Sequence, residues 1–305
     1  MSSLNKQNIQ GILLLDKPIG LTSNGALQRI KRLFCAKKAG HTGSLDPLAT
    51  GMLPICFGEA TKFSQFLLDS DKHYRVVMKL GIKTTTGDAE GEVISTRPVE
   101  NNEAQQFATV SQEFLGAIQQ IPPMFSAIKH QGKPLYQLAR KGLEVERTPR
   151  TVQIHSLRLE KTETDQIYFD VHCSKGTYIR TLVEDIGERL GCGAHVIGLH
   201  RLAVIPYENT AMYTLTELEK MCEQSGLETL HRLLLPVETS VQALPAIKLS
   251  TSAAFYMRMG QPVLVPHLPT QGFVRVFSED GRFMGIGEIM EDGRVTPRRL
   301  VAQAA

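Results

Sequence analysis

The sequence predicts an α+β protein, with a mixed, largely antiparallel sheet and flanking helices followed by a small C-terminal β domain. The 305 residues exceed one average domain and suffice for about two. Hydrophobic residues make up 42% of them, which is enough to bury a core. Helical and alternating hydrophobic patterns are interleaved as far as about residue 245, whereas 246–305 shows mainly strands and turns.

The first part of the chain alternates strands and helices. A short buried strand is predicted at 11–15, and a helix follows because Thr22, Ser23 and Asn24 offer N-cap oxygens ahead of apolar residues at helical spacing. The run 40–51 is rich in glycine, threonine and proline and predicts a loop. The next expected elements are a helix at 59–68, a strand at 74–80, a turn between strands at 84–91 and a helix at 103–116.

The middle of the chain begins with an irregular segment. Two adjacent prolines remove backbone donors, so 121–134 predicts an exposed loop leading into a short basic helix at 135–141. A helix opened by Thr177 and ended by Gly191 is also expected. The remaining expected elements are strands at 151–160, 166–174 and 194–204, acidic helices to about 237, and C-terminal strands near 272–277, 282–289 and 294–300.

Charge is distributed unevenly, although the net charge is only +3. Basic residues gather in 17–45, which contains no acid, and again in 129–150. Acids dominate 82–120 and 208–240. This separation predicts a cationic face, as in a protein that binds nucleic acid; ordinary solvated helix faces are the alternative.

Several classes of protein are disfavoured. No apolar run approaches the ~18 residues of a membrane span, and the N-terminal residues lack the apolar stretch of a secretory signal. The five cysteines have no Cys-x-x-Cys spacing, which indicates a reducing, cytoplasmic setting. There is no dinucleotide motif, P-loop or nucleophile elbow.

Zinc chemistry is not expected from the spacing of the histidines. The nine histidines form no His-x-x-x-His or His-x-Glu pair. His195 and His200 are five residues apart on one predicted strand and should face opposite sides.

Two residues are candidates for chemistry. Asp46 lies in the glycine-rich loop, where glycines let a backbone approach a ligand; an ordinary Asp-Pro turn residue is the alternative. Arg180 lies in the first turn of its predicted helix, where the macrodipole opposes a cation, so an acidic or phosphate partner outside the helix is expected. An i,i+4 pair with Glu184 is the alternative for Arg180. Tyr74 and Tyr178, taken alone, are more typical of core or strand aromatics than of a functional site.

Six segments carry a family resemblance when they are taken together. They are GILLLDKP at 11–18, AGHTGSLDPLATGMLP at 39–54, DSDKHYRV at 69–76, HCSKGTYIRTL at 172–182, GCGAHVIGLHRLAV at 191–204 and GRVTPRRLV at 293–301. In this order they resemble the bacterial tRNA pseudouridine synthase B (TruB) family over nearly the whole chain. The resemblance implies a pseudouridine-synthase domain at 1–245, with a thumb-like insertion at about 122–150, and a PUA-like RNA-binding domain at 246–305.

The resemblance also implies an activity. The family isomerises the T-loop uridine at position 55 of tRNA to pseudouridine, and it uses neither a cofactor nor a metal. By position, Asp46 matches the family's essential aspartate and Arg180 the arginine that pairs with it. Tyr74 matches the tyrosine that stacks on the target base and is a candidate for the later proton transfer.

Base flipping is part of the implied mechanism, because the target uridine is buried in the folded T loop. His41 matches the residue that occupies the vacated space, and Tyr178 and Leu199 match positions around the flipped base. Gly198 and His200 depart from the larger or basic residues common in relatives. The implied partner is tRNA, contacted at its T arm and, by the C-terminal domain, at its acceptor stem. No membrane and no obligate protein partner are expected, and the protein is expected to be a monomer.

Three alternatives are weighed against this assignment. A non-catalytic RNA-binding or RNA-folding protein on the same scaffold would not need Asp46, Tyr74 and Arg180 together. A guide-RNA-dependent relative shares the aspartate motif, but the basic insertion and the lack of long lysine-rich tails favour a stand-alone enzyme. A metal-dependent nuclease is disfavoured because acids do not cluster around the glycine-rich loop.

Overall fold

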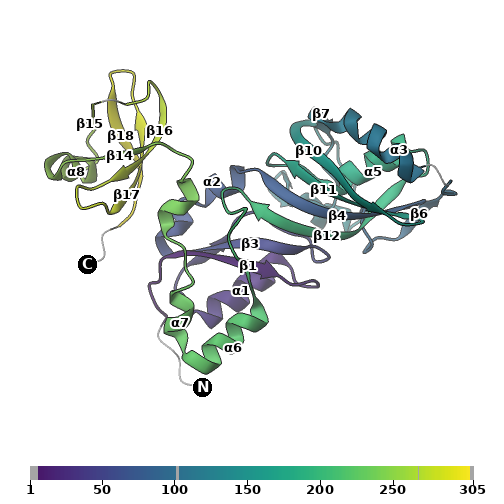
Figure 1. Ribbon diagram of the computed structural model, residues 1–305, viewed down its shortest axis with the longest axis horizontal. Coiled ribbons are helices and arrows are strands. Elements are labelled where there is room, and N and C mark those ends of the chain that lie inside the picture. Colours follow the sequence, from purple (N-terminus) through teal and green to yellow (C-terminus); the bar gives the residue numbers. More distant parts are fainter. Residues whose placement is uncertain (1–5, 101–102, 267, 303–305) are drawn as a thin grey trace.

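The computed structural model describes residues 6–100, 103–266 and 268–302, and it confirms the predicted fold class. A nine-stranded sheet forms the body, and a separate five-stranded sheet forms the C-terminal part (Figure 1). No helix within the described ranges is long and apolar enough to cross a membrane.

The body sheet is mixed but largely antiparallel. Its strands run in the order β13 (Tyr213–Thr214), β1 (Gly11–Lys17), β3 (Thr50–Phe57), β12 (Ala194–Val204), β4 (Lys72–Leu80), β11 (Gln166–Cys173), β10 (Arg150–Thr162) and β7 (Gly116–Gln120), and β2 (Ala39–His41) also pairs with β3. Only the β1–β13 and β3–β12 pairs on this path are parallel. At the β3–β12 contact, Gly51 has φ +97°, and a Cβ there would lie 2.3 Å from the Arg201 carbonyl oxygen. Glycine therefore permits the close approach of these two strands.

Helices cover the body sheet and the C-terminal sheet. They are α1 (Ser23–Leu33), α2 (Ser64–Asp69), α3 (Glu103–Val110), α4 (Leu135–Ala139), α5 (Ile179–Arg189), α6 (Leu215–Ser225), α7 (Leu227–His231) and α8 (Thr251–Arg258). Short 3₁₀ segments lie at Gly58–Lys62, Ser111–Phe114 and Val237–Val241. Two small hairpin sheets pair β5 (Ile82–Thr84) with β6 (Val93–Thr96) and β8 (Lys129–His130) with β9 (Lys133–Pro134). Thr22 caps α1 as predicted, since its side chain accepts a hydrogen bond from Gly25.

Two hydrophobic cores on the body meet at the place where the glycine-rich loop lies. In one core α3 and α5 pack against β4 and β11, and in the other α1, α6 and α7 pack against β1 and β3 (Figure 1). Tyr74 and Leu199 pack against both cores. In the loop, Leu45 belongs to the second core and Leu48 packs against the first. The loop backbone is thereby fixed between the two halves of the body.

The C-terminal sheet has its own core and also contacts the body. Its order is β14 (Ala246–Lys248), β16 (Gly272–Phe277), β17 (Phe283–Ile289), β18 (Arg294–Leu300) and β15 (Val263–Leu264). Phe283 and Ile286 pack against a third core that includes Phe63 of the body. Lys62 Nζ donates to the Leu300 carbonyl at 2.9 Å. Apolar and polar contacts thus join the two parts.

Three predicted helices differ from the structure. The helix expected at 103–116 ends earlier, because a 3₁₀ turn follows α3 and Gly116, at φ +86°, begins β7. The predicted cap Thr177 is wrong, because the N-cap residue of α5 is Tyr178 and the Thr177 hydroxyl donates to the Ser174 carbonyl. Likewise, the helix expected at 59–68 is divided into a 3₁₀ turn and α2.

The segment expected to be irregular, 121–134, contains a hairpin. Gln131 and Gly132 both have positive φ, 49° and 81°, as a two-residue type I′ turn requires, and this turn joins β8 to β9. The prediction missed the turn because glutamine is uncommon at a positive φ.

The faces predicted for His195 and His200 are also wrong. A register shift between Val196 and Gly198 leaves one extra residue in β12. His195 therefore pairs with Lys79 and His200 with Arg75, which lie on the same face of β4.

Candidate active site

The glycine-rich loop predicted at 40–51 is shorter in the structure, residues 42–49, because its first two residues belong to β2 and its last two to β3. It is held by buried polar side chains from outside it. Ser23, at the start of α1, accepts a hydrogen bond from the Leu45 N–H at 2.7 Å and donates one to the Leu45 carbonyl at 3.0 Å. Arg201 of β12 donates to the Gly43 carbonyl at 3.0 Å. The residue next to Leu45 is Asp46, so these contacts fix the backbone that carries its carboxyl group.

Lys17 contacts both the loop and the segment before α1. Its ammonium group is fully buried and donates to the carbonyls of Pro18 and Leu21 at 2.9 and 2.7 Å, with Pro47 at 3.5 Å. Burial lowers the pKa of Lys17 to about 8, although the negative charge of Asp46 opposes the change. The lysine thus supplies both hydrogen bonds and positive charge beside the loop.

Asp46 takes part both in a backbone turn and in an ion pair. Its carbonyl accepts a hydrogen bond from Ala49 at 3.1 Å, which is the turn considered as the alternative. Its carboxylate Oδ2 lies 3.0 Å from Arg180 Nε. The Asp46 side chain is 43% exposed, whereas that of Arg180 is 7% exposed. A buried guanidinium therefore holds a carboxylate that solvent or a ligand can reach.

Arg180 is satisfied by partners outside its own helix. Nη1 donates to the Thr86 carbonyl at 2.8 Å and Nη2 to the Phe125 carbonyl at 2.7 Å. Nε also lies 3.7 Å from Asp88 Oδ2. These contacts agree with the expectation of an external acidic partner for a cation in the first turn of α5.

Asp88 is a residue that sequence reasoning missed. It is 3% exposed, and its Oδ1 accepts hydrogen bonds from Thr86 Oγ1 at 2.6 Å and from the Glu90 N–H at 3.0 Å. The segment 84–91 was predicted only as a turn. Its local pattern gives no sign that the turn folds against α5, so Asp88 becomes a candidate only in three dimensions.

Opposing effects set the pKa of Asp46. Burial raises it, and the nearby Asp88 carboxylate raises it further, whereas Arg180 and Lys17 lower it. The net direction is upward. Asp46 is thus a stronger base than an exposed aspartate, while the guanidinium fixes its position.

Tyr74, Leu199 and Arg201 share one face of the sheet. Tyr74 is directly opposite Arg201 and Val76 directly opposite Leu199 in the β4–β12 register, and such residues point to the same side. Burial raises the pKa of the Tyr74 phenol, although Arg201 opposes the change. The phenol therefore stays protonated at neutral pH.

Gln120 fixes the start of α5. It is 2% exposed, accepts a hydrogen bond from the Tyr178 N–H at 3.0 Å and donates to the Tyr178 carbonyl at 3.3 Å. Arg180 follows two residues later, so this contact positions the guanidinium. Sequence reasoning missed Gln120 because it lies 58 residues away from its partner.

His41 lies at the end of β2 next to the loop. Burial lowers the pKa of its imidazole and the positive charge of Arg201 lowers it further, so the ring is neutral at physiological pH. In the described residues its buried Nδ1 has no hydrogen-bond partner. Burial also raises the pKa of Tyr178.

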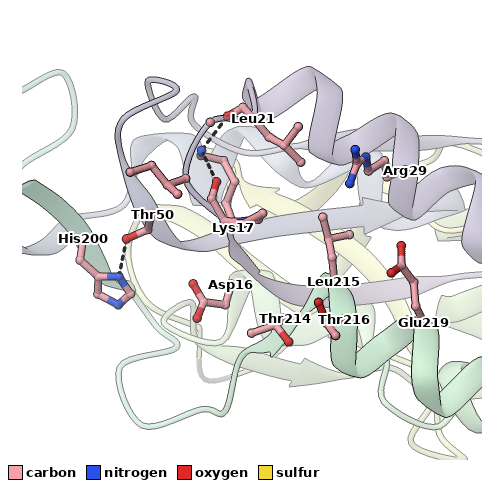
Figure 2. A pocket seen from close by; sticks show the side chains of 13 residues that line it. Asp16, Lys17, Leu21, Arg29, Thr50, His200, Thr214, Leu215, Thr216 and Glu219 are labelled. Atoms are coloured by element: carbon pink, nitrogen blue, oxygen red, sulfur yellow. Dashed lines mark hydrogen bonds between the residues drawn. The ribbon is translucent and has the colours of Figure 1, made fainter. Parts of the chain in front are cut away.

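A pocket of about 710 Å³ lies beside this site. Figure 2 shows Thr50 and His200, hydrogen-bonded at 2.8 Å, near Lys17, with Arg29 and Glu219 further along the pocket. Asp46 is not among its lining residues. This pocket is therefore next to the candidate chemistry and not at it.

Comparison with solved structures gives the class of protein. The chain superposes with a TM-score of 0.73 and 27% identity on the "Crystal Structure of a Cbf5-Nop10-Gar1 Complex", covering 97% of this chain and 85% of that one. It superposes with a TM-score of 0.74 and 25% identity on the "Structure of H/ACA RNP bound to a substrate RNA containing 2'-deoxyuridine", covering 96% and 85%. The fold is that of a pseudouridine synthase.

Sequence comparison gives the family. Residues 31–179 match the family described as "TruB family pseudouridylate synthase (N terminal domain)", 180–242 match "tRNA pseudouridylate synthase B C-terminal domain" and 245–301 match "Pseudouridine synthase II TruB, C-terminal". The chain is 55% identical to the tRNA pseudouridine synthase B of Coxiella burnetii, over 98% of this chain and 96% of the relative. It is 53% identical to that of Tolumonas auensis, over 97% and 93%. The chain belongs to the TruB family of pseudouridine synthases.

Proposed function

We propose that this pseudouridine synthase acts on tRNA, that its target is the uridine at position 55 in the T loop, and that Asp46 is the catalytic carboxylate. The observation that carries the proposal is the contact between Asp46 and the buried Arg180, 3.0 Å long, in a loop fixed from both sides. Relatives more than 50% identical over nearly the whole chain, named tRNA pseudouridine synthase B, support the choice of tRNA.

The reaction breaks the N-glycosidic bond between ribose C1′ and uracil N1 and joins C1′ to uracil C5. C5 then loses its proton and N1, released from the ribose, gains one, so the product is an isomer of the substrate. Asp46 starts the reaction as a nucleophile or as a base, and its upward pKa shift favours both roles. Arg180 fixes the direction of the carboxylate and balances its charge.

Base flipping brings the uridine to Asp46. Tyr74 and Leu199 lie on one sheet face at the junction of the two cores, where an aromatic ring can stack on the extruded base. Tyr178 contributes the wall at the start of α5. His41, neutral and at the edge of the loop, fills the space that the base leaves in the RNA. Because burial raises the pKa of Tyr74, its phenol stays protonated, so it can stack on the base but is a poor base for the later proton transfer.

Two basic surfaces bind the tRNA in this proposal. The thumb-like insertion, residues 122–150, presents Lys133 and Arg140 to solvent and closes on the T arm. The unit at 246–305 is the RNA-binding domain that reaches the acceptor stem, and 1–245 is the catalytic domain. The proposed enzyme acts as a monomer, without a protein partner or a guide RNA. Relatives 55% identical over 98% of this chain, named tRNA pseudouridine synthase B, support this choice over the Cbf5 chain solved in a complex, which is 27% identical.

The test is to map pseudouridine on an unmodified tRNA transcript after incubation with the protein alone. Carbodiimide adducts of pseudouridine stop reverse transcription, which locates each modified position. The proposal expects one enzyme-dependent stop, at position 55, and none in a transcript with cytidine at that position. Stops elsewhere but not at 55, or a requirement for a second RNA, would overturn the proposed target.

A further inference from the structure

Three histidines and one aspartate meet on the sheet face that points away from the candidate active site. His73 of β4 and His172 of β11 are directly opposite each other in the register. Their neighbours Tyr74 and Cys173 pack against the core on the other face, as strand alternation requires. The four residues that meet, Asp71, His73, His155 and His172, are called the histidine cluster below.

His155 joins the cluster through an irregularity in β10. A register shift between Ile154 and Ser156 leaves His155 as the extra residue of a bulge. A bulge redirects a side chain that regular pleating would place elsewhere. The cluster is therefore built from three neighbouring strands, and local spacing along the chain does not reveal it.

The potential ligand atoms are close together. His155 Nε2 lies 2.9 Å and His172 Nε2 3.8 Å from Asp71 Oδ2. One ligand atom each from Asp71, His155 and His172 lies within 4.8 Å of the others. The His73 and His172 ring centroids are 4.0 Å apart, and those of His155 and His172 are 4.5 Å apart. A tetrahedral metal ion needs ligand atoms at such spacing, after small adjustments.

The cluster also has unused binding capacity. The Nε2 atoms of His73 and His172 are buried and have no hydrogen-bond partner among the described residues. An imidazole nitrogen without a hydrogen-bond partner can offer its lone pair to a metal, and leaving such a buried nitrogen unpartnered is costly.

We propose that the histidine cluster binds a divalent transition-metal ion of the zinc type. Asp71, His155 and His172 supply the protein ligands, and a water completes the tetrahedron. His73 is a positioning residue that packs against the His172 ring. The ion links the loop before β4 to β10 and β11 on the outer face, so its effect is on stability and not on the chemistry at Asp46.

The test uses Co²⁺ as a spectroscopic probe on the untagged, metal-stripped full chain. Tetrahedral Co²⁺ with nitrogen and oxygen ligands gives visible absorption bands that an octahedral aqueous ion lacks. We expect the bands to saturate at one ion per chain and to vanish when Zn²⁺ is added. Zn²⁺ should also raise the melting temperature by about 3 °C or more, since it binds only the folded chain.

Variants locate the site. His155→Gln and His172→Asn should each remove the bands and the Zn²⁺-dependent rise in melting temperature. His130→Gln, a change at an exposed histidine of the thumb-like insertion, is the matched control and should leave both intact. Because His155 is exposed, its variant stays folded even if His172→Asn does not. An absence of saturable bands, or equal bands in His155→Gln, overturns the proposal and leaves an ion pair between His155 and Asp71. These readouts do not depend on the proposed tRNA activity.

Discussion

Arg180 shows how far single residues could be predicted from the sequence. A cation in a first helical turn signals an acidic or phosphate partner outside the helix, and the glycine-rich loop made Asp46 a candidate, but only the family resemblance implied that the two residues pair. Asp88 and Gln120 could not be predicted, because each contacts α5 only after distant segments have folded against it. Residues with a local electrostatic signature are therefore predictable, whereas residues that position them are not.

Replacing Asp88 with asparagine tests the electrostatics around Asp46. The negative charge of Asp88 raises the pKa of Asp46, so neutralising it should lower that pKa. The acid limb of the kcat/KM profile should then move to lower pH, while the amide oxygen of the new side chain still accepts the bonds from Thr86 and Glu90. Asp170→Asn, which removes an exposed ion pair with Arg75, is the control. An unmoved acid limb in D88N would contradict the assigned coupling.

Helices and strands were predicted best where periodicity is strong. The expected strand at 194–204 coincides with β12, and those at 272–277 and 294–300 with β16 and β18. Predictions failed where a side chain from a distant segment, or an unusual residue type, takes the place of the usual local signal. The first turn of α5 has no side-chain cap of its own and is held by Gln120 instead. An unusual Gln-Gly turn forms the β8–β9 hairpin.

Removing the Gln120 side chain tests whether α5 must be held to position Arg180. Gln120→Ala breaks both contacts with the Tyr178 backbone and lets the guanidinium shift. We expect kcat to fall by about 10- to 100-fold with KM for tRNA nearly unchanged, as for a small misplacement of a catalytic group. Gln119→Ala, at the exposed neighbouring position, should retain wild-type kcat. If the two variants had equal kcat, Gln120 would have no positioning role.

Charge reversal in the thumb-like insertion tests its part in RNA binding. Lys133→Glu or Arg140→Glu should weaken tRNA binding and reduce the salt slope by about one counterion each. The measurement is the dissociation constant for tRNA across a range of salt concentrations, with saturating kcat as a second readout. Arg282→Glu makes the same charge reversal at an exposed arginine just before β17, so its salt slope can be compared with those of the insertion variants. Identical salt slopes for wild type and the insertion variants would remove this surface from the binding site.

At the scale of the whole molecule, the sequence predicted the division into two sheets but not how they are joined. Phe283 and Ile286 of the C-terminal sheet pack against the body, and Lys62 bonds to Leu300. The histidine cluster has the same origin, since its members come from three strands and the loop before β4. Hydrophobic periodicity defines which face of an element is buried; it does not define which distant element covers it.

Lys72 links global stability to pH. Its buried ammonium donates to the carbonyls of Leu67, Leu68 and Ser70, and burial lowers its pKa from 10.5 to about 8. Between these values the unfolded chain binds a proton that the native protein does not, so this group makes stability rise with pH by up to about 1.4 kcal/mol per unit. Lys72→Met should lose this rise relative to wild type.

Urea unfolding at several pH values above 8 measures the effect. Lys79→Met, at a half-exposed lysine of the same strand paired with Asp165, is the control and should keep the wild-type slope. A wild-type slope in K72M as well would show that Lys72 does not titrate in this range.

The most direct test of the catalytic assignment is tritium release from carbon 5 of uridine in unmodified tRNA, measured for wild type and Asp46→Asn together. The account predicts release by wild type and none by D46N, with tRNA affinity nearly unchanged, because Asp46 takes part in the chemistry and little in binding. Comparable release by both proteins would contradict the role of Asp46. Tight tRNA binding without release by either would contradict the proposed enzymatic function and leave an RNA-binding protein on a pseudouridine-synthase fold.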